Sequence, residues 1–289
     1  MQPAFGNLLS AIRRTDPFLL VGLEGPMETS LTILIGSGIV ASLMACLWVY
    51  QWIRTDATIV DVGWSAGLGI LSILYASDFP FYLDRPWLVA TLAFFWSIRL
   101  GGYLLVNRVI GKSEDGRYRS LRQRWGERAH VYFFLFFQIQ VVLAVAFSLP
   151  ILTAMANPAP FGTVGDLLGM TVWLVAVSCE MIADRQLARF RRDPQNRGKV
   201  CQAGLWRYSR HPNYFFEWLH WWAYVFFAIG SGYWWISLAG PVLMLLFLLF
   251  ITGIPATEAQ AVASRGDAYR RYQRTTSAFI PWFPKDDTP

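Results

Sequence analysis

The most constraining feature of the sequence is a series of long apolar runs. A helix that crosses the hydrocarbon core of a bilayer needs about 20 predominantly apolar residues. Seven runs approach or reach that length, namely 29–50, 62–77, 86–107, 131–151, 164–182, 212–230 and 233–256. The chain is 55% hydrophobic and 15% charged, whereas soluble proteins carry about 25% charged residues. The sequence therefore predicts an all-α polytopic membrane protein of about seven transmembrane helices.

The basic residues are distributed unevenly between these runs. Most of the 25 Lys and Arg lie in two loops, 108–130 and 185–211, and in the segment after the last run. Because positive charge accumulates on the cytoplasmic side of membrane proteins, we expect both loops and the C-terminus to be cytoplasmic. The expected organisation is an N-terminal segment 1–28, a membrane domain 29–256 and a cytoplasmic tail 257–289. In a bacterium this chain would lie in the inner membrane.

Two other classes of function are excluded by the same composition. The clustered positive charge follows the membrane topology, which argues against a general nucleic-acid surface. The three cysteines, Cys46, Cys179 and Cys201, lack the CxxC spacing of a zinc site. We therefore expect neither a metal centre nor a disulfide framework.

Polar and ionisable side chains recur at helical spacing in three of the apolar runs, one of which is taken together with its helical extension beyond residue 182. Such residues are costly in a membrane and normally face a cavity or a partner. Separations of three, four and seven residues place them on one helix face. The three stripes are Trp96, Arg99, Tyr103 and Asn107; Glu180, Asp184 and Arg191; and Asn213, Glu217, His220 and Tyr224. We expect a polar cavity open to the cytoplasm; the alternative is a set of interhelical ion pairs that only hold helices together.

A nucleotide cofactor suits the chemistry expected of this cavity. Guanidinium groups match phosphate oxygens in both charge and geometry, and the arginine-rich loops lie beside acidic and amide groups. The loop that enters the sixth run ends in Arg210-His211-Pro212-Asn213. Proline is preorganised for the first helical turn, and helix N-termini attract anions. A well-made helix start explains Pro212 but not its polar neighbours.

These segments resemble the steroid 5-alpha-reductase superfamily. The resemblance is carried by residues 204–214 (GLWRYSRHPNY) with Glu217-Trp218, by 184–187 (DRQL) and by the tail motif that starts YRRY at Tyr269. The DVGW motif at 61–64 is similar to the bacterial reductase-like branch, and the similarity covers roughly residues 55 to 284. Members are seven-span membrane enzymes that use NADPH to reduce an enone carbon–carbon double bond.

The resemblance implies cofactor roles for many residues. Asn213 and Glu217 would hold the nicotinamide carboxamide, and Tyr269 or Tyr272 would close over the site from the tail. Further cofactor contacts are implied for Arg99, Tyr103, Asn107, Arg108, Glu180, Asp184, Arg191, Tyr208, Arg210, His211 and Tyr214.

The catalytic positions depart from the family pattern. Steroid reductases polarise the substrate ketone with a glutamate and a tyrosine, and the corresponding positions here are Asp61 and Trp96. Asp61 could serve as an acid if protonated, which an apolar pocket favours because burial destabilises the charged form. Trp96 donates one N–H but cannot deliver a proton. An alternative role for Asp61 is to cap the helix that begins there.

The sequence thus predicts a membrane-embedded NADPH-dependent reductase of an enone in a lipophilic, steroid-like or isoprenoid substrate taken from the bilayer. Membrane lipids are expected contacts, and no nucleic acid or obligate protein partner is expected. One alternative is an S-adenosylmethionine-dependent methyltransferase of the isoprenylcysteine or phospholipid type, which has a similar Arg-His-Pro-x-Tyr helix start. That cofactor carries no phosphate, so the arginines would be surplus. A second alternative is a non-catalytic lipid-binding membrane protein, which the departure at Trp96 supports.

Overall fold

The structure is a computed structural model that describes residues 25–251 and 253–286. Within these two ranges every regular element is a helix and none is a strand, which confirms the predicted all-α class. Most of the expected N-terminal segment 1–28 lies outside the described residues.

Six helical stretches of the described chain are long and apolar enough to cross a membrane, so the protein is a multi-pass membrane protein. These stretches are Thr29–Arg54, Ile59–Ala76, Asp84–Val109, Gly116–Met155, Val164–Arg192 and Trp234–Arg265. The sixth apolar run of the sequence forms α9 (Pro212–Ala228), which has 17 residues. At 1.5 Å per residue α9 is about 26 Å long, slightly less than a hydrocarbon core of about 30 Å.

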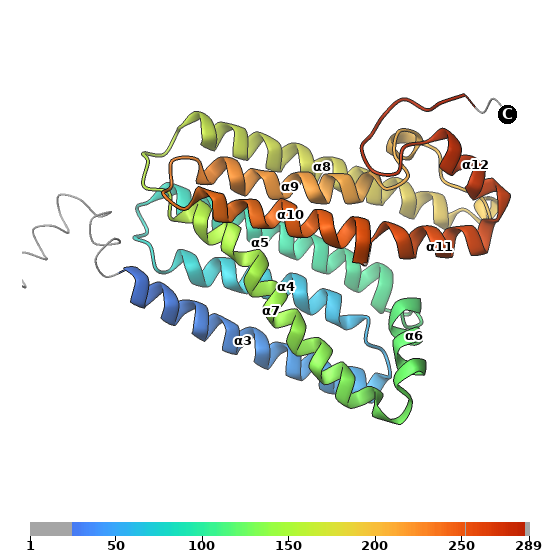
Figure 1. Cartoon of the computed structure of the whole chain (residues 1–289), viewed down its shortest axis with the longest axis horizontal. Helices are drawn as coiled ribbons and strands as arrows, with labels where there is room; N and C mark the ends of the chain where they lie inside the picture. Colours follow the sequence, from blue (N-terminus) through green and yellow to red (C-terminus); the bar gives the residue numbers. More distant parts are fainter. Residues whose placement is uncertain (1–24, 252, 287–289) are drawn as a thin grey trace, which may run out of the picture. The chain divides into compact units, whose positions relative to one another are not determined.

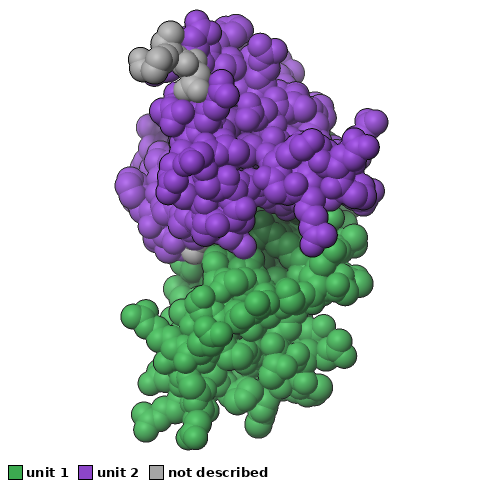
Figure 2. Space-filling view, turned by 90° about the vertical axis from the view of Figure 1, so that its right-hand side faces the viewer, with its two compact units in different colours: residues 1–161 green, residues 162–289 purple. Residues whose placement is uncertain are grey.

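The chain forms two compact units, residues 1–161 and 162–289 (Figure 2). The helices of the first unit are α3 (Gly25–Arg54), α4 (Ile59–Ala76), α5 (Asp84–Leu104), η1 (Leu105–Val109), α6 (Gly116–Trp125), η2 (Gly126–Arg128) and α7 (Ala129–Met155). α4 packs on α3, α5 and α7. Ser65 of α4 and Ser97 of α5 exchange hydrogen bonds between each hydroxyl and the other's carbonyl, at 2.8 and 2.7 Å. These bonds satisfy two hydroxyls that the apolar surroundings would otherwise leave unpaired.

The helices of the second unit are α8 (Val164–Arg192), η3 (Pro194–Asn196), η4 (Gly204–Arg207), α9, η5 (Trp234–Leu238), α10 (Ala239–Leu246), η6 (Phe247–Ile251), α11 (Ile254–Arg265) and α12 (Asp267–Thr275). α8 and α9 lie side by side, and α10 packs on α9 (Figure 1). Pro212 is the first residue of α9, as the sequence predicts, and His211 is its N-cap residue. Gly266, with a φ of 54°, forms the corner between α11 and α12 in a conformation that glycine adopts most easily.

Candidate functional site

Two of the polar stripes meet in the second unit, where α8 packs against α9. Asn213, in the first turn of α9, donates from its Nδ2 to Oδ1 of Asp184 on α8 at 3.3 Å. Asp184 and Glu180, one turn earlier on α8, are both buried. The Oδ1 of Asn213 is buried and has no hydrogen-bond partner among the described residues. Because the amide nitrogen faces the carboxylate, this oxygen remains available to accept a bond from a ligand.

The stripe continues along α9 as a buried polar column. Glu217 is 8% exposed, and its Oε1 accepts a hydrogen bond from the indole of Trp221 at 3.2 Å. The Nδ1 of His220 lies 3.0 Å from the backbone oxygen of Glu217 and 3.7 Å from its Oε1. His220 and Tyr224 are fully buried. The α9 stripe is therefore an inward-facing column, as its spacing predicts.

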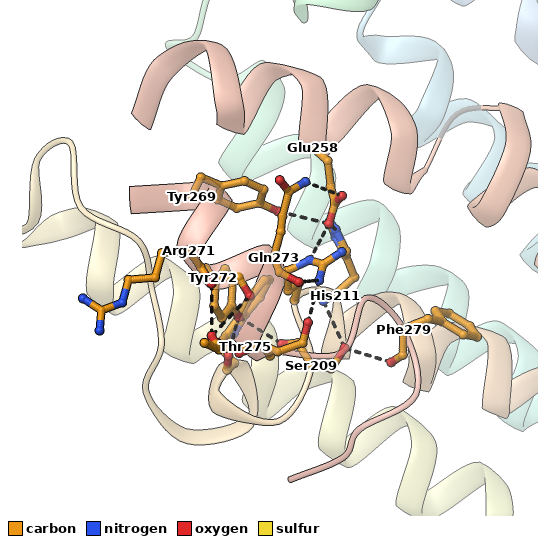
Figure 3. Close-up of polar contacts among 12 residues, drawn as sticks. Ser209, His211, Glu258, Tyr269, Arg271, Tyr272, Gln273, Thr275 and Phe279 are labelled. Carbon is orange, nitrogen blue, oxygen red and sulfur yellow. Dashed lines mark hydrogen bonds and ion pairs between the residues drawn. The ribbon is translucent and has the colours of Figure 1, made fainter. Parts of the chain in front are cut away.

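A second polar network joins the loop before α9 to α11, α12 and the chain beyond (Figure 3). The Nε of Arg210 donates to Oε1 of Glu258 at 2.6 Å, and its Nη1 donates to the backbone oxygens of Gln273 and Thr276 at 2.9 and 2.5 Å. The Nε2 of His211 lies 3.3 Å from the same Oε1. The side chain of Gln273 donates to Oε2 of Glu258 at 2.8 Å. Glu258 is thus the centre of the network.

Sequence reasoning missed Glu258, which lies just past the last apolar run. A charged residue at that position looks like the first residue of a solvated tail. One signal could have found it: Arg210 lies next to the start of an apolar helix, where its charge needs an acidic partner. Glu258 is the acidic residue of the tail nearest to the membrane domain in the sequence.

Tyr269 and Tyr272, one of which the resemblance implies would close over the site, are both buried in α12. Tyr269 donates to Oε1 of Glu258 at 3.4 Å. The hydroxyl of Tyr272 donates to the backbone oxygens of Trp206 and Ser209. Burial, together with the nearby Glu258 carboxylate in the case of Tyr269, raises the pKa of both phenols above the usual range. Both tyrosines are therefore neutral donors that hold α12 against the loop before α9.

The remaining candidates of this unit lie around the same loop. The ring of Tyr214 stacks on that of His211, with centroids 5.3 Å apart, and its hydroxyl lies 3.3 Å from Oγ1 of Thr257. Tyr208 is 36% exposed, and Arg191 is exposed near the end of α8.

Asp61, in the first unit, bonds to two residues of α6. Its Oδ2 accepts from Nη2 of Arg117 at 3.0 Å, and its Oδ1 accepts from the hydroxyl of Tyr118 at 2.6 Å. α4 begins at Ile59 with Thr58 as its N-cap residue, so Asp61 lies inside the first turn. The alternative that Asp61 caps this helix is therefore wrong, because its carboxylate is turned to Arg117 and Tyr118.

The stripe predicted on α5 also belongs to the first unit. Trp96 is fully buried and meets Trp64 edge-on, with ring centroids 6.1 Å apart. Arg99 and Tyr103 are half-buried. The Nδ2 of Asn107 donates to the backbone oxygen of Tyr103 at 2.9 Å, where α5 gives way to the π-helical turn η1.

Several arginines of the first basic loop are engaged by acidic neighbours. Arg122 pairs with Glu114 at 2.7 Å, and Arg117 pairs with Asp115 at 3.0 Å. Arg108, a predicted cofactor residue, lies 3.8 Å from Asp115. Burial alone would raise the pKa of Asp115, but the hydrogen bonds and charge of Arg117 outweigh burial and hold that pKa below its usual value. Much of the positive charge of this loop is therefore paired with carboxylates of the loop itself.

Comparison with known proteins gives a family for the chain. An uncharacterised protein of Schizosaccharomyces pombe, C594.04c, is 28% identical over 280 residues, which cover 81% of this chain and 75% of that protein. No solved structure matches the chain. Residues 47–276 match DUF1295, described as a protein of unknown function, and this range includes Asp61, the Asn213 pair and the Glu258 network. The chain belongs to the DUF1295 family.

Proposed function

We propose that this protein is a membrane-embedded reductase that uses NADPH to reduce the carbon–carbon double bond of an enone in a lipophilic, steroid-like or isoprenoid substrate. The observation that carries the proposal is the buried Oδ1 of Asn213, which has no partner among the described residues and lies beside the Asp184 pair. A nicotinamide carboxamide has an NH₂ group that can donate a hydrogen bond to this oxygen. Glu217, one turn further along α9, adds a second buried acceptor.

To bind the phosphates of the cofactor, the protein needs cations that are not already paired with a carboxylate. Arg185, Arg189, Arg192 and Arg207 are exposed around the loop between α8 and α9. The guanidinium of Arg210, by contrast, is bound to Glu258 and to two backbone oxygens. In this proposal Arg210 fixes the start of α9, and so the position of Asn213, while the exposed arginines bind the phosphates.

The bound cofactor supplies the hydride, and the protein supplies position and charge. Reduction of an enone also needs a group that polarises the carbonyl and a proton donor. By resemblance Asp61 would serve the carbonyl, but its two carboxylate oxygens already accept hydrogen bonds from Arg117 and Tyr118, so in this proposal Asp61 orients these two donors. Trp96 contributes an N–H at most. Tyr118, whose hydroxyl lies 2.6 Å from Asp61, adds a proton-bearing group that Trp96 lacks.

Seven crossings with a cytoplasmic C-terminus are part of the proposal. The backbone N–H of Arg210 donates to the oxygen of Ser277 at 2.8 Å, and that of Trp282 donates to the oxygen of Tyr208 at 2.9 Å. The loop before α9 and the chain after α12 therefore lie on one side of the membrane, which requires an even number of crossings between them. If Trp234–Arg265 supplies one crossing, α9 supplies the other. In a bacterium these two segments would face the cytoplasm from the inner membrane.

A methyltransferase that uses S-adenosylmethionine is the second candidate, and one observation favours it. Arg117, Arg122 and Arg210 are all paired with carboxylates, so fewer arginines remain for phosphates than the sequence suggests. S-adenosylmethionine carries no phosphate and would need none of them.

Thermal melting of the purified full-length chain in detergent, with NADPH, NADH or S-adenosylmethionine added, separates the candidates. A ligand at a hundredfold excess over its Kd stabilises the folded state by about 2.7 kcal/mol. We expect NADPH to raise Tm. We expect Glu217→Gln and Asn213→Ala to weaken NADPH binding about tenfold, because Gln replaces one buried carboxylate oxygen with an NH₂ donor and Ala removes the amide acceptor altogether. The exposed control Glu127→Gln should bind as the wild type does.

The other outcomes are equally informative. A shift with S-adenosylmethionine alone would replace the reductase by the methyltransferase. No shift with any of the three ligands would favour the non-catalytic lipid-binding alternative. A normal NADPH shift in both site variants would leave the cofactor assignment in place but remove Asn213 and Glu217 from it.

A further inference from the structure

The chain beyond α12 is non-helical but firmly attached to the second unit. We name residues 276–286 the C-terminal loop. Its N–H groups at Trp282 and Lys285 donate to the backbone oxygens of Tyr208 and Thr275, at 2.9 and 2.8 Å. The oxygen of Phe279 accepts from the hydroxyl of Ser209 at 2.8 Å. Residues between these attachments therefore have a defined position.

Contacts with α8 indicate how deep in the membrane the loop before α9 lies. The indole of Trp206 donates to the backbone oxygen of Ala183 at 2.9 Å, and the N–H of Leu205 donates to Oε1 of Gln186 at the same distance. From the start of α8 at Val164 to Ala183 is about 30 Å of helix, which equals the thickness of a hydrocarbon core. The loop before α9 therefore lies where α8 leaves the hydrocarbon.

The C-terminal loop lies at the same depth. Besides its bonds to residues 208–210, its Phe279 packs edge-on against Phe215 and Trp218 of α9, with ring centroids 5.7 Å apart in both pairs. A side chain that reaches the first two turns of an apolar helix is at the membrane boundary.

The next residues of this loop are large, apolar and exposed. Ile280, Trp282 and Phe283 are 59%, 68% and 74% exposed. Exposed apolar side chains are normal on a helix that faces lipid, but these three lie on a segment outside the helices. Tryptophan and other aromatic side chains are enriched at membrane–water interfaces. Their exposure therefore indicates insertion into the interface.

A cavity of about 360 Å³ adjoins the C-terminal loop. Three cations line it, Arg210, Arg274 and Lys285, and Trp282 and Phe283 are also part of its wall. No acidic side chain is among the described residues of the wall, although Glu258 compensates Arg210 from outside it. The cavity therefore combines positive charge with an aromatic border, which matches a phosphate attached to an acyl chain.

We propose that the C-terminal loop anchors the second unit to the membrane surface by binding an anionic phospholipid. Ile280, Trp282 and Phe283 insert among the upper acyl carbons, and the cavity takes the headgroup phosphate beside Arg274 and Lys285. Each cation near a membrane surface strengthens binding to anionic lipid about fivefold. The proposal does not depend on the reductase activity.

Lipid titration of the full-length protein in detergent, followed by native mass spectrometry, tests whether the cations of the cavity select an anionic headgroup. We expect short-chain phosphatidylglycerol to bind at least tenfold more tightly than phosphatidylcholine of the same chain length. The double variant Arg274→Gln/Lys285→Gln should lose about 25-fold in phosphatidylglycerol affinity, about fivefold for each cation. The matched control Arg124→Gln/Arg128→Gln removes two exposed cations from the first unit and should stay within twofold. Equal affinity for both lipids, or an unchanged double variant, would overturn the proposal.

Competition distinguishes a lipid headgroup from a soluble phosphate ligand. Glycerol 3-phosphate, inorganic phosphate and NADPH lack acyl chains, and we expect none of them to displace phosphatidylglycerol at equal concentration. Displacement by any of the three would mean that the cavity serves a soluble ligand. Trp282→Ala/Phe283→Ala should weaken phosphatidylglycerol binding, and an unchanged affinity would refute the insertion. If either tail variant fails to fold, judged by gel filtration and Tm, the two wild-type experiments still decide.

Discussion

A single carboxylate, that of Glu258, contacts side chains at the start of α9 and in α12. Glu258 pairs with Arg210, with side chains 10% and 15% exposed for Arg210 and Glu258 respectively, and also meets His211 and Gln273. Because both side chains are so little exposed, water cannot easily take the place of Glu258 as the partner of Arg210. When one member of a buried pair is removed, the remaining charge has lost both its partner and its hydration.

Glu258→Gln should therefore lower the free energy of unfolding by about 3 kcal/mol, because Gln keeps the shape but leaves the Arg210 charge uncompensated. Thermal or denaturant unfolding in detergent measures the change. The control Asp267→Asn removes the exposed pair with Arg270, where the aspartate side chain is 97% exposed, and should have no measurable effect. Equal destabilisation by both variants would show that Glu258 has no special role.

The relative positions of single residues could be predicted from the sequence where spacing along one helix determines them. Asn213 and Glu217 lie four residues apart on α9, so their common face follows from helix geometry. The Arg210–Glu258 pair joins residues 48 apart in the sequence, and the Tyr118–Asp61 bond joins residues 57 apart. Local periodicity contains no information on such pairs, which depend on how α11 and α6 return to the membrane helices.

At the scale of elements, α11 and α12 form a small packed unit. Tyr269 and Tyr272 bury their rings with Ala261, and Val200 and Val262 pack against this cluster. The three-residue spacing of the tyrosines puts both on one face of α12. Hydrogen bonds from both phenols then tie α12 to Glu258 and to the loop before α9.

This packing predicts a stability loss at alkaline pH. Burial raises the pKa of Tyr269 and Tyr272, so the folded protein holds these protons more tightly than the unfolded chain does. Their contribution is fully present below a pH of about 10 and is lost as the pH rises toward the folded pKa values. Between pH of about 9 and 11, Tm should fall less in Tyr269→Phe/Tyr272→Phe than in the wild type.

An exposed tyrosine is the control for that titration. Tyr233 is 69% exposed, and Tyr233→Phe should show the same fall in Tm as the wild type. Parallel curves for the wild type and the double variant would mean that the two buried phenols do not contribute to the alkaline transition.

Element boundaries were predictable only where the apolar pattern itself ends. The run 62–77 corresponds to α4 (Ile59–Ala76), whereas α8 continues to Arg192, ten residues past the end of its apolar run at 182, as the helical spacing of Asp184 and Arg191 predicts. Arg, Gln, Leu and Ala are good helix formers, so α8 extends into water without an apolar requirement. The last run is interrupted by the π-helical turn η6 (Phe247–Ile251), which hydropathy alone does not reveal.

At the scale of the whole molecule, positive charge and chain contacts bear on the same question of topology. The sequence places most Lys and Arg in two loops and the tail. The hydrogen bonds of Arg210 and Trp282 independently place the second basic loop and the tail together. Both observations support the proposed topology, in which α9 crosses the membrane with 17 residues, fewer than those of the six longer stretches.

Reporter fusions test this topology without purified protein. With seven crossings, green fluorescent protein fused after residue 113, after residue 198 or at the C-terminus should fluoresce, because all three sites are cytoplasmic. Alkaline phosphatase fused after residue 159 or 231 should be active, because both sites are on the opposite side. If α9 does not cross, the fusions after 198 and at the C-terminus would report opposite sides. That result would also contradict the packing of the C-terminal loop on residues 208–210, on which the lipid-anchor proposal depends.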